Sequence, residues 1–274
     1  MPSSTAVCYV YGIVPAATDL ASAPPGVDDA RVALESCDSV AALVSSVDGE
    51  AYAPSSLETS TADVEWMSPR AMAHDRVLTW ASDRGDGAVV PLPMFSLFTG
   101  PAAVRSMLCD RSSQLAEALR HVAQGREYAL RVYRVDAELM DAMAGFSPRL
   151  AELADKAAQS TPGQRYLLER KLEDEKRSEM RGVTIEITDA IVGSLGAYAI
   201  AAVKSPIPRV TDAAGRGPMV LNAAFLVAPD RLADFQQTLT SLVEQHGARG
   251  FRFDFTGPWP PYHFAGGERT KTDA

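Results

Sequence analysis

The sequence predicts an α+β protein of two domains, on the basis of its length, its composition and the order of elements in its second half. The chain has 274 residues, and domains of about 100 to 200 residues are usual. Its 46% apolar and 22% charged residues are typical of packed globular proteins. We place an N-terminal mixed α+β domain at residues 1–124 and a C-terminal domain at residues 125–274.

Strands dominate the first third of the chain. Residues 7–14 are rich in β-branched and aromatic side chains and stop at Pro15, as expected of an interior strand. Residues 16–29 contain Pro24-Pro25-Gly26 and predict a loop. Two more strands are expected at residues 31–35 and 40–47.

A polar loop at residues 55–61 precedes the first predicted helix. Ser68-Pro69 supplies an N-cap followed by proline at the first helical position, although the helix could begin nearer Asp63. Side chains spaced three and four apart give it one buried face: Met67, Ala71, His74, Leu78 and Ala81. Residues 83–87 end it.

The apolar segment 89–98 contains Pro91 and Pro93, which cannot donate to a sheet ladder, so any strand here is interrupted or lies at an edge. Thr99-Gly100-Pro101 then opens another helix, which ends near Gly125. Its apolar stripe is Val104, Leu108, Leu115, Leu119 and Val122.

The C-terminal half has the order of a ferredoxin-like βαββαβ domain. We expect a strand at 127–135, a long helical excursion at 137–203 with its main helix from about Pro162, and paired strands near Arg209 and Val220. A helix capped by Asp230 ends at Gly247, and residues 250–255 alternate as a last strand. A proline- and aromatic-rich tail follows at 256–274.

Charge and cysteine usage exclude several classes of function. A net charge of −9 repels nucleic acid. Cys8, Cys37 and Cys109 are far apart and form no C-x-x-C pair, so we expect neither a disulfide framework nor a zinc ribbon, and a reducing cytoplasm. The longest uncharged segment, residues 190–203, is too short for a membrane span, and the start has no positive n-region.

Motifs for catalysis are missing from the sequence. It contains no G-x-S-x-G, no Walker A sequence and no strand-linked G-x-G-x-x-G. His74-Asp75 is the one pair that hints at a metal, but adjacent residues point apart on a helix and no second histidine cluster accompanies them. We therefore expect no catalytic residues, no metal and no cofactor, with His74 packed on an apolar face.

A charged segment at residues 165–181 is the first candidate for a binding site. Its charges are nearly balanced, Glu173 and Arg177 are spaced i,i+4, and apolar residues are sparse. It is either a solvated helix supported by ion pairs or a helix that docks a partner. The candidate residues here are Arg165, Tyr166, Arg170, Lys171, Glu173 and Arg177.

The tail is the second candidate. Residues 256–264 read Thr-Gly-Pro-Trp-Pro-Pro-Tyr-His-Phe, and the three prolines hold the chain extended, with Trp259 and Tyr262 fixed in place. These aromatic residues either fold back over the domain that they follow or contact a partner directly. We expect the first, so Trp259 should matter for stability before it matters for binding.

Several of these segments resemble the gas vesicle protein F/L family. The opening strand Tyr-Val-Tyr-Gly-Ile-Val at 9–14 is similar to the start of that family, and Glu65-Trp66, Arg70-Ala71 and His74-Asp75 are similar to its first helix. Matches later in the chain are Pro-Gly-Gln-Arg-Tyr-Leu at 162–167 followed by Lys171, Asn-Ala-Ala-Phe-Leu-Val at 222–227, and the 256–264 sequence. The resemblance covers nearly the whole chain.

The resemblance implies an accessory or minor structural protein for the assembly of gas vesicles, located in the cytoplasm at the vesicle shell. Its implied partners are the small hydrophobic major shell protein and other gas vesicle accessory proteins, and no catalysis is implied. One segment departs from the family. Where the family commonly has Pro-Leu-Arg-Phe-Gly-Thr, this chain has Pro-Leu-Pro-Met-Phe-Ser at 91–96, so any contact of that arginine is lost.

Two other functions remain open on the sequence alone. Ferredoxin-like sheets host small ligands in other proteins, so a ligand sensor or an enzyme is the alternative; a deep pocket lined by polar groups would favour it. Some βαββαβ domains display aromatic residues to RNA, and Phe251, Phe253 and Phe255 share one face. These phenylalanines lack the basic and glycine-rich setting of RNA-binding sheets.

Overall fold

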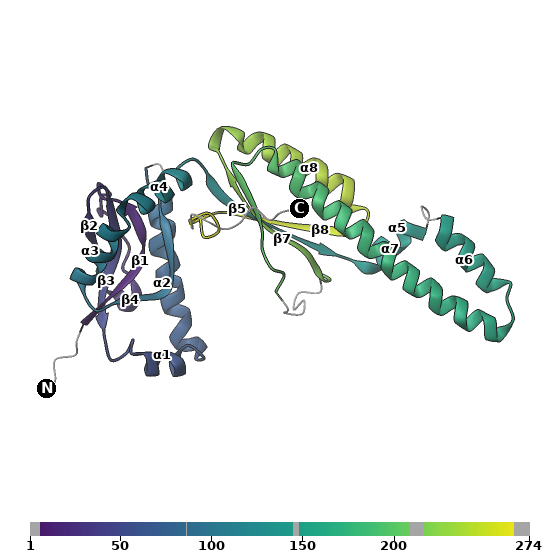
Figure 1. Cartoon of the computed structure of the whole chain (residues 1–274), viewed down its shortest axis with the longest axis horizontal. Helices are drawn as coiled ribbons and strands as arrows, with labels where there is room; N and C mark the ends of the chain where they lie inside the picture. Colours follow the sequence, from purple (N-terminus) through teal and green to yellow (C-terminus); the bar gives the residue numbers. More distant parts are fainter. Residues whose placement is uncertain (1–5, 86, 145–147, 209–215, 266–274) are drawn as a thin grey trace. The chain divides into compact units, whose positions relative to one another are not determined.

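The computed structural model describes residues 6–85, 87–144, 148–208 and 216–265. It has two four-stranded sheets, each with its own helices (Figure 1). The chain forms two compact units: one runs to Glu127 and includes the residues from Pro258 on, and the other is Tyr128–Gly257. The predicted α+β class is confirmed. The units differ from the predicted domains in the tail, because residues from Pro258 belong with the N-terminal unit.

The N-terminal unit is built on a sheet with the strand order β2-β3-β1-β4. Its strands are β1 (Ala6–Pro15), β2 (Ala33–Cys37), β3 (Val40–Asp48) and β4 (Val90–Phe98). β1 pairs with both β3 and β4 in antiparallel fashion, with a bulge between Val10 and Gly12. A Cβ on Gly12 would lie 2.8 Å from the Val90 carbonyl oxygen and 2.9 Å from Leu78 Cδ2, so the bulge requires glycine.

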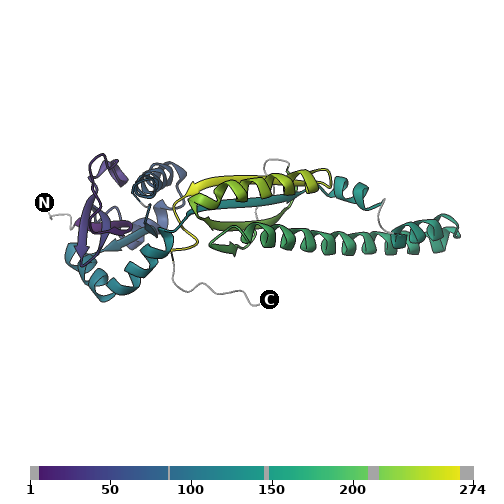
Figure 2. The same ribbon diagram turned by 90° about the horizontal axis from the view of Figure 1, so that it is seen from above.

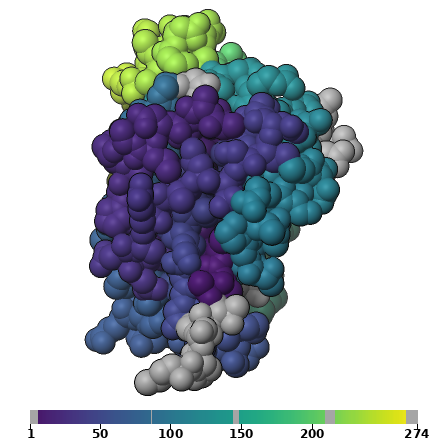
Figure 3. Space-filling view, turned by 90° about the vertical axis from the view of Figure 1, so that its left-hand side faces the viewer, coloured from purple at the N-terminus to yellow at the C-terminus, as the bar shows by residue number. Residues whose placement is uncertain are grey.

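The helices of this unit are α1 (Pro54–Ser60), α2 (Val64–Ser82), α3 (Pro101–Asp110) and α4 (Ser112–Val122). α2 packs on the face of the sheet that carries Tyr9, Tyr11 and Leu43. The alternate residues of these strands, Val10 and Ala42 among them, are also fully buried, because α3 and α4 lie against the strands as well. Figure 3 shows α3 and α4, in teal, beside the purple strands of this unit.

Of four local predictions for this unit, three need correction and one is confirmed. α1 occupies the segment expected to be a polar loop. α2 does not begin at Ser68-Pro69 but after Asp63, the alternative start given by the sequence. The Asp63 carboxylate accepts from the Glu65 N–H, and Pro69 lies inside the helix. The single helix expected after Gly100 is two, α3 and α4, divided at Arg111. His74 is buried as expected.

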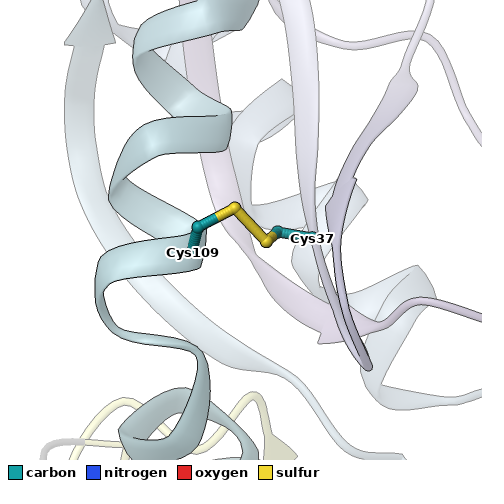
Figure 4. Close-up of a disulfide and its surroundings, with 2 residues drawn as sticks. All are labelled: Cys37 and Cys109. Atoms are coloured by element: carbon teal, nitrogen blue, oxygen red, sulfur yellow. A yellow bond between two sulfur atoms is a disulfide. The ribbon is translucent and has the colours of Figure 1, made fainter.

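A disulfide that the sequence analysis did not expect joins Cys37, at the end of β2, to Cys109 in α3 (Figure 4). The two cysteines are 72 residues apart in sequence, but their Cα atoms are 5.5 Å apart because α3 packs against the edge strand β2. Spacing along the chain gives no sign of this proximity, which only the fold creates. The third cysteine, Cys8, is free and buried.

The second unit has the predicted ferredoxin-like order. Its strands are β5 (Arg126–Arg134), β6 (Ala201–Lys204), β7 (Met219–Val227) and β8 (Phe251–Trp259), arranged β6-β7-β5-β8. Three helices, α5 (Asp136–Ala144), α6 (Pro148–Ala158) and α7 (Pro162–Gly196), form the excursion between β5 and β6. A 3₁₀ turn at Pro229–Arg231 leads into α8 (Leu232–Gly247).

Two boundaries in this unit differ from the prediction. The long helix ends at Gly196 and β6 begins at Ala201, where the sequence analysis still expected helix; the expected strand near Arg209 lies outside the described residues. α8 begins after Arg231, without a side-chain cap from Asp230. The C-terminal half of α7 and α8 cover one face of the sheet (Figure 2).

The three phenylalanines of β8 face the core. Phe251 is buried, and Phe253 and Phe255 pack against the same cluster as α7 and α8. The ring of Phe255 stacks on Tyr128 with centroids 5.4 Å apart. Phe253 and Phe255 are thus partly buried against this cluster, and the arrangement does not support the RNA-binding hypothesis.

Candidate partner-binding surface

The excursion forms a helical hairpin. α6 and the N-terminal half of α7 pack side by side (Figures 1 and 2). Pro162 stands in the first turn of α7, where its missing N–H is not needed. Arg149 of α6 reaches Glu175 of α7 at 2.7 Å, and Leu150 is buried in the core of the unit with Leu172 packed against it. The hairpin is thus held by apolar contacts and an ion pair.

The six candidate residues of the charged segment, Arg165, Tyr166, Arg170, Lys171, Glu173 and Arg177, all lie on α7 and are all exposed. Tyr166 is 64% exposed and its neighbour Leu167 is 67% exposed. Large apolar side chains left in water at the end of a protruding helix are typical of contact residues, whereas scattered polar ones are not. Leu167 was not among the candidates predicted from the sequence.

Ion pairs on this hairpin differ from the expected pattern. Glu173 pairs with Lys176, with 3.0 Å between Nζ and Oε1, instead of with Arg177. One Nη of Arg165 donates to the carbonyl oxygen of Ala158 at 3.3 Å, which ties the start of α7 to the end of α6. Arg170, Lys171 and Arg177 form no ion pair within the described part of the chain.

The other two candidates, Trp259 and Tyr262, lie in the tail and belong to the N-terminal unit. Trp259 ends β8 and is 39% exposed, and Tyr262 is 44% exposed. The structure therefore does not join them with the α7 candidates, which belong to the other unit. Tyr262 Oη donates to Asp75 of α2 at 3.0 Å. Burial, with the Asp75 carboxylate next to it, raises the pKa of this phenol.

The tail is anchored beyond Tyr262 as well. The backbone N–H of His263 donates to Glu127 at 2.9 Å, and Glu127 is only 2% exposed. Pro260, Pro261 and Phe264 are buried. Residues 260–264 of the tail thus pack on the N-terminal unit, whereas the sequence predicted packing over the domain that the tail follows. Their partners Asp75 and Glu127 are far away in sequence and gave no local signal.

An aromatic cluster in the N-terminal unit was also missed by sequence reasoning. Tyr9 Oη lies 2.8 Å from Nδ1 of His74 and accepts from the Phe95 N–H at 3.3 Å. Arg70 lies 4.0 Å above the Trp66 ring and forms an ion pair with Asp28. Burial lowers the pKa of His74 to about 4, so this ring is neutral and hydrogen-bonded in the core.

Phe95 in this cluster lies in the segment that departs from the family pattern. It stands at the glycine of Pro-Leu-Arg-Phe-Gly-Thr and has φ 61°, a left-handed conformation that glycine adopts easily and bulky residues rarely adopt. Its ring stacks on Trp66 with centroids 5.8 Å apart. Ring packing therefore offsets backbone strain at this position.

Two cavities bear on ligand binding. One, of about 310 Å³, lies between α5, α6 and α7 and is lined mainly by apolar side chains, with Asp141 and Lys176 as its charged members. A more open one of about 560 Å³ follows α2 between Met72 and Trp80. No cluster of potential metal ligands occurs in the described ranges, and no described helix is long and apolar enough to cross a membrane.

Relatives among known proteins span almost the whole chain. Gas vesicle protein L1 of Halobacterium salinarum is 26% identical over 266 residues, which cover 94% of this chain and 89% of that protein. Gas vesicle protein L of a Streptomyces species is 29% identical over 208 residues, which cover 74% of this chain and 71% of that protein.

Solved structures of gas vesicle protein GvpF have the same fold. The crystal structure from an Anabaena species matches with a TM-score of 0.77 at 20% identity and covers 96% of this chain and all of its own. The one from Microcystis aeruginosa matches with a TM-score of 0.67 at 19% identity. The match covers 96% of this chain and 99% of that structure.

The resemblance seen in the sequence is confirmed by a family model. The model described as gas vesicle synthesis protein GvpL/GvpF matches residues 7–266, which include the anchored tail and the α6–α7 hairpin as well as both sheets. The chain belongs to the gas vesicle synthesis protein GvpL/GvpF family and is involved in gas vesicle formation.

Proposed function

We propose that this chain is a non-enzymatic accessory or minor structural protein of gas vesicle assembly. It binds the hydrophobic major shell protein and other gas vesicle proteins, and it works in the cytoplasm at the vesicle shell. The observation that carries the proposal is the exposed end of the α6–α7 hairpin, where Tyr166 and Leu167 stand in solvent. A shell subunit that aggregates readily needs protein surfaces that cover its apolar parts during growth.

The tail has a different role in this proposal. Tyr262 donates a hydrogen bond to Asp75, and the backbone N–H of His263 donates one to Glu127. These two bonds hold this part of the tail on the N-terminal unit. Trp259 is the aromatic residue of the tail that ends β8, and it is 39% exposed. We assign partner contact first to the α7 candidates and treat the tail chiefly as a structural element.

The experiment is a gene deletion in a host that forms gas vesicles, with complementation by the full chain. We expect the deletion strain to form few or malformed vesicles by electron microscopy, and the wild-type gene to restore them. Normal vesicles in the deletion strain would refute a role in assembly. Photo-crosslinking from position 166 then tests the partner: a crosslink to the shell protein is expected, and crosslinks only to proteins outside the vesicle would contradict it.

The alternative, a ferredoxin-like small-molecule binder or enzyme, is favoured by one observation, the apolar cavity between α5, α6 and α7. Its lining contains two charged residues, Asp141 and Lys176, and few polar groups that could orient a substrate. A thermal-shift screen with small apolar compounds tests it. A saturable shift that Ala154→Trp abolishes would favour ligand binding over protein binding at this hairpin.

A further inference from the structure

One side of α7 carries an unusual line of arginines. Arg170, Arg177 and Arg181 follow one another at spacings of seven and four, so they lie on one face of the helix. Tyr166 stands four residues before the first arginine and Ile185 four residues after the last, and Asp174 lies between them. We call these six residues the arginine face. All six are exposed, Tyr166 at 64% and Ile185 at 60%.

The charge of this face is opposite to that of the whole chain. Three arginines and one aspartate give it a net charge of +2, whereas the chain carries −9. Three acidic residues elsewhere on α7 are already paired: Glu173 with Lys176, Glu175 with Arg149 and Asp189 with Lys204. Within the described residues, Arg170, Arg177 and Arg181 form no ion pair, so their charges are available to another molecule.

The hairpin leaves this face open. α6 packs along one side of the N-terminal half of α7, and Figure 1 shows no helix or strand of the same unit on its opposite side. Arginine and tyrosine are the residue types that contribute most to protein interfaces. Because both ends of the face are apolar and its middle is basic, it is complementary to a surface whose ends are also apolar and whose middle is acidic.

We propose that the arginine face binds an acidic amphipathic helix of a partner protein. Carboxylates of that helix pair with the three arginines, and its apolar residues cover Tyr166 and Ile185. The 20 residues from Tyr166 to Ile185 span about 28 Å along α7, so the partner helix needs about five turns. This inference rests on the proposed function, because it names the chemistry of a partner in vesicle assembly.

Other occupants fit the face less well. A nucleic acid would meet Asp174 in the middle of the face and a chain of net charge −9, both of which repel phosphates. A second copy of this chain would have to supply a matching acidic and apolar helix face. Both are outcomes of the experiment below.

The test compares the full chain with a variant in which Arg170, Arg177 and Arg181 are changed to glutamate. The control variant has the same change in net charge, by Arg76→Glu, Arg120→Glu and Lys156→Glu, at three exposed positions away from the face. The probe is a fluorescent 19-residue helical peptide with glutamates on one face and leucines near both ends. A peptide of the same composition in scrambled order is the reference.

We expect the wild-type and control proteins to bind the helical peptide, with an affinity that falls with salt, and the arginine variant to bind at least about tenfold more weakly. The scrambled peptide should bind weakly to all three. Equal binding of both peptides, equal affinity of both variants, tighter binding of a 20-nucleotide RNA than of the peptide, or self-association that is lost in the arginine variant would each overturn the proposal.

Complementation of the deletion strain separates this inference from the proposed function. The control variant should restore vesicles, and the arginine variant should fail although it accumulates and melts like wild type. If the arginine variant restores vesicles fully, the arginine face is not the binding surface while the role in assembly stands. If the deletion itself leaves vesicles normal, the proposed function fails first.

Discussion

His263 binds Glu127 through two of its atoms. Its backbone N–H donates to Oε2 at 2.9 Å, and its ring Nδ1 lies 2.7 Å from Oε1. Because a carboxylate only accepts hydrogen bonds, Nδ1 carries a proton in this contact. Glu127 is only 2% exposed, so its carboxylate is buried. A residue at the start of β5 thus holds His263 of the tail in place.

Replacing this carboxylate should loosen the tail. In Glu127→Gln one of the two acceptor oxygens becomes an NH2 donor and the negative charge is lost, so we expect a loss of about 1–3 kcal/mol in stability. The variant should melt at lower temperature and lose its tail to a protease sooner than wild type. Glu117→Gln, at an exposed position of α4, is the control. Unchanged melting and unchanged cleavage would mean that the contact does not hold the tail.

The buried histidine of the aromatic cluster should make stability depend on pH. Burial lowers the pKa of His74 from 6.5 to about 4, so the unfolded chain takes up this proton more readily than the folded one. The contribution of neutral His74 to the stability of the fold is fully present above pH 6.5. It is lost as the pH falls towards 4, and the total loss is up to about 3 kcal/mol.

Denaturant titrations between pH 4 and 7 measure this effect. His74→Gln should flatten the decline of stability with falling pH, whatever its effect on stability at pH 7. Some slope should persist, because burial also lowers the pKa of His246. His121→Gln is the control, and a slope in His74→Gln equal to that of wild type would contradict the assignment.

Backbone strain at Phe95 should reverse the usual order of stability between an alanine and a glycine variant. Alanine keeps the left-handed conformation at φ 61° and loses the ring, whereas glycine loses the ring and relieves the strain. Phe95→Gly should therefore be more stable than Phe95→Ala by about 1 kcal/mol. At Leu97, in the same strand, the order should be the usual one, with alanine above glycine. Chemical denaturation of the four variants measures their free energies of unfolding. If the alanine variant is more stable than the glycine variant at both positions, Phe95 is not strained.

Sequence reasoning succeeded where one periodicity or one turn residue dominates. β8 alternates strictly, α8 has an apolar stripe that stops at Gly247, and both were placed within a few residues. The split βαβ order followed from these elements, and the sheet order β6-β7-β5-β8 agrees with it.

Prediction failed where tertiary contacts decide. β6 consists of Ala-Ala-Val-Lys and is a strand only because Ala202 pairs with Phe225 of β7. The serine- and threonine-rich segment of α1 has no helical pattern of its own. At the candidate site, exposure of Tyr166 followed from the sparse apolar content of the helix. The packing of Tyr262 and His263 on the N-terminal unit could not be predicted, because their partners Asp75 and Glu127 form no sequence pattern with the tail.

The Cys37–Cys109 bond closes a covalent ring that contains β3, α1, α2 and β4. One cut of the backbone at any point inside this ring leaves the two pieces joined through sulfur. A nicked molecule would then keep its full mass on a gel without reductant and separate into fragments only with it. Loops of the N-terminal unit such as residues 49–53 can thus be severed without the loss of either piece, which gives this half of the protein a tolerance to proteolysis that the second unit lacks among its described residues.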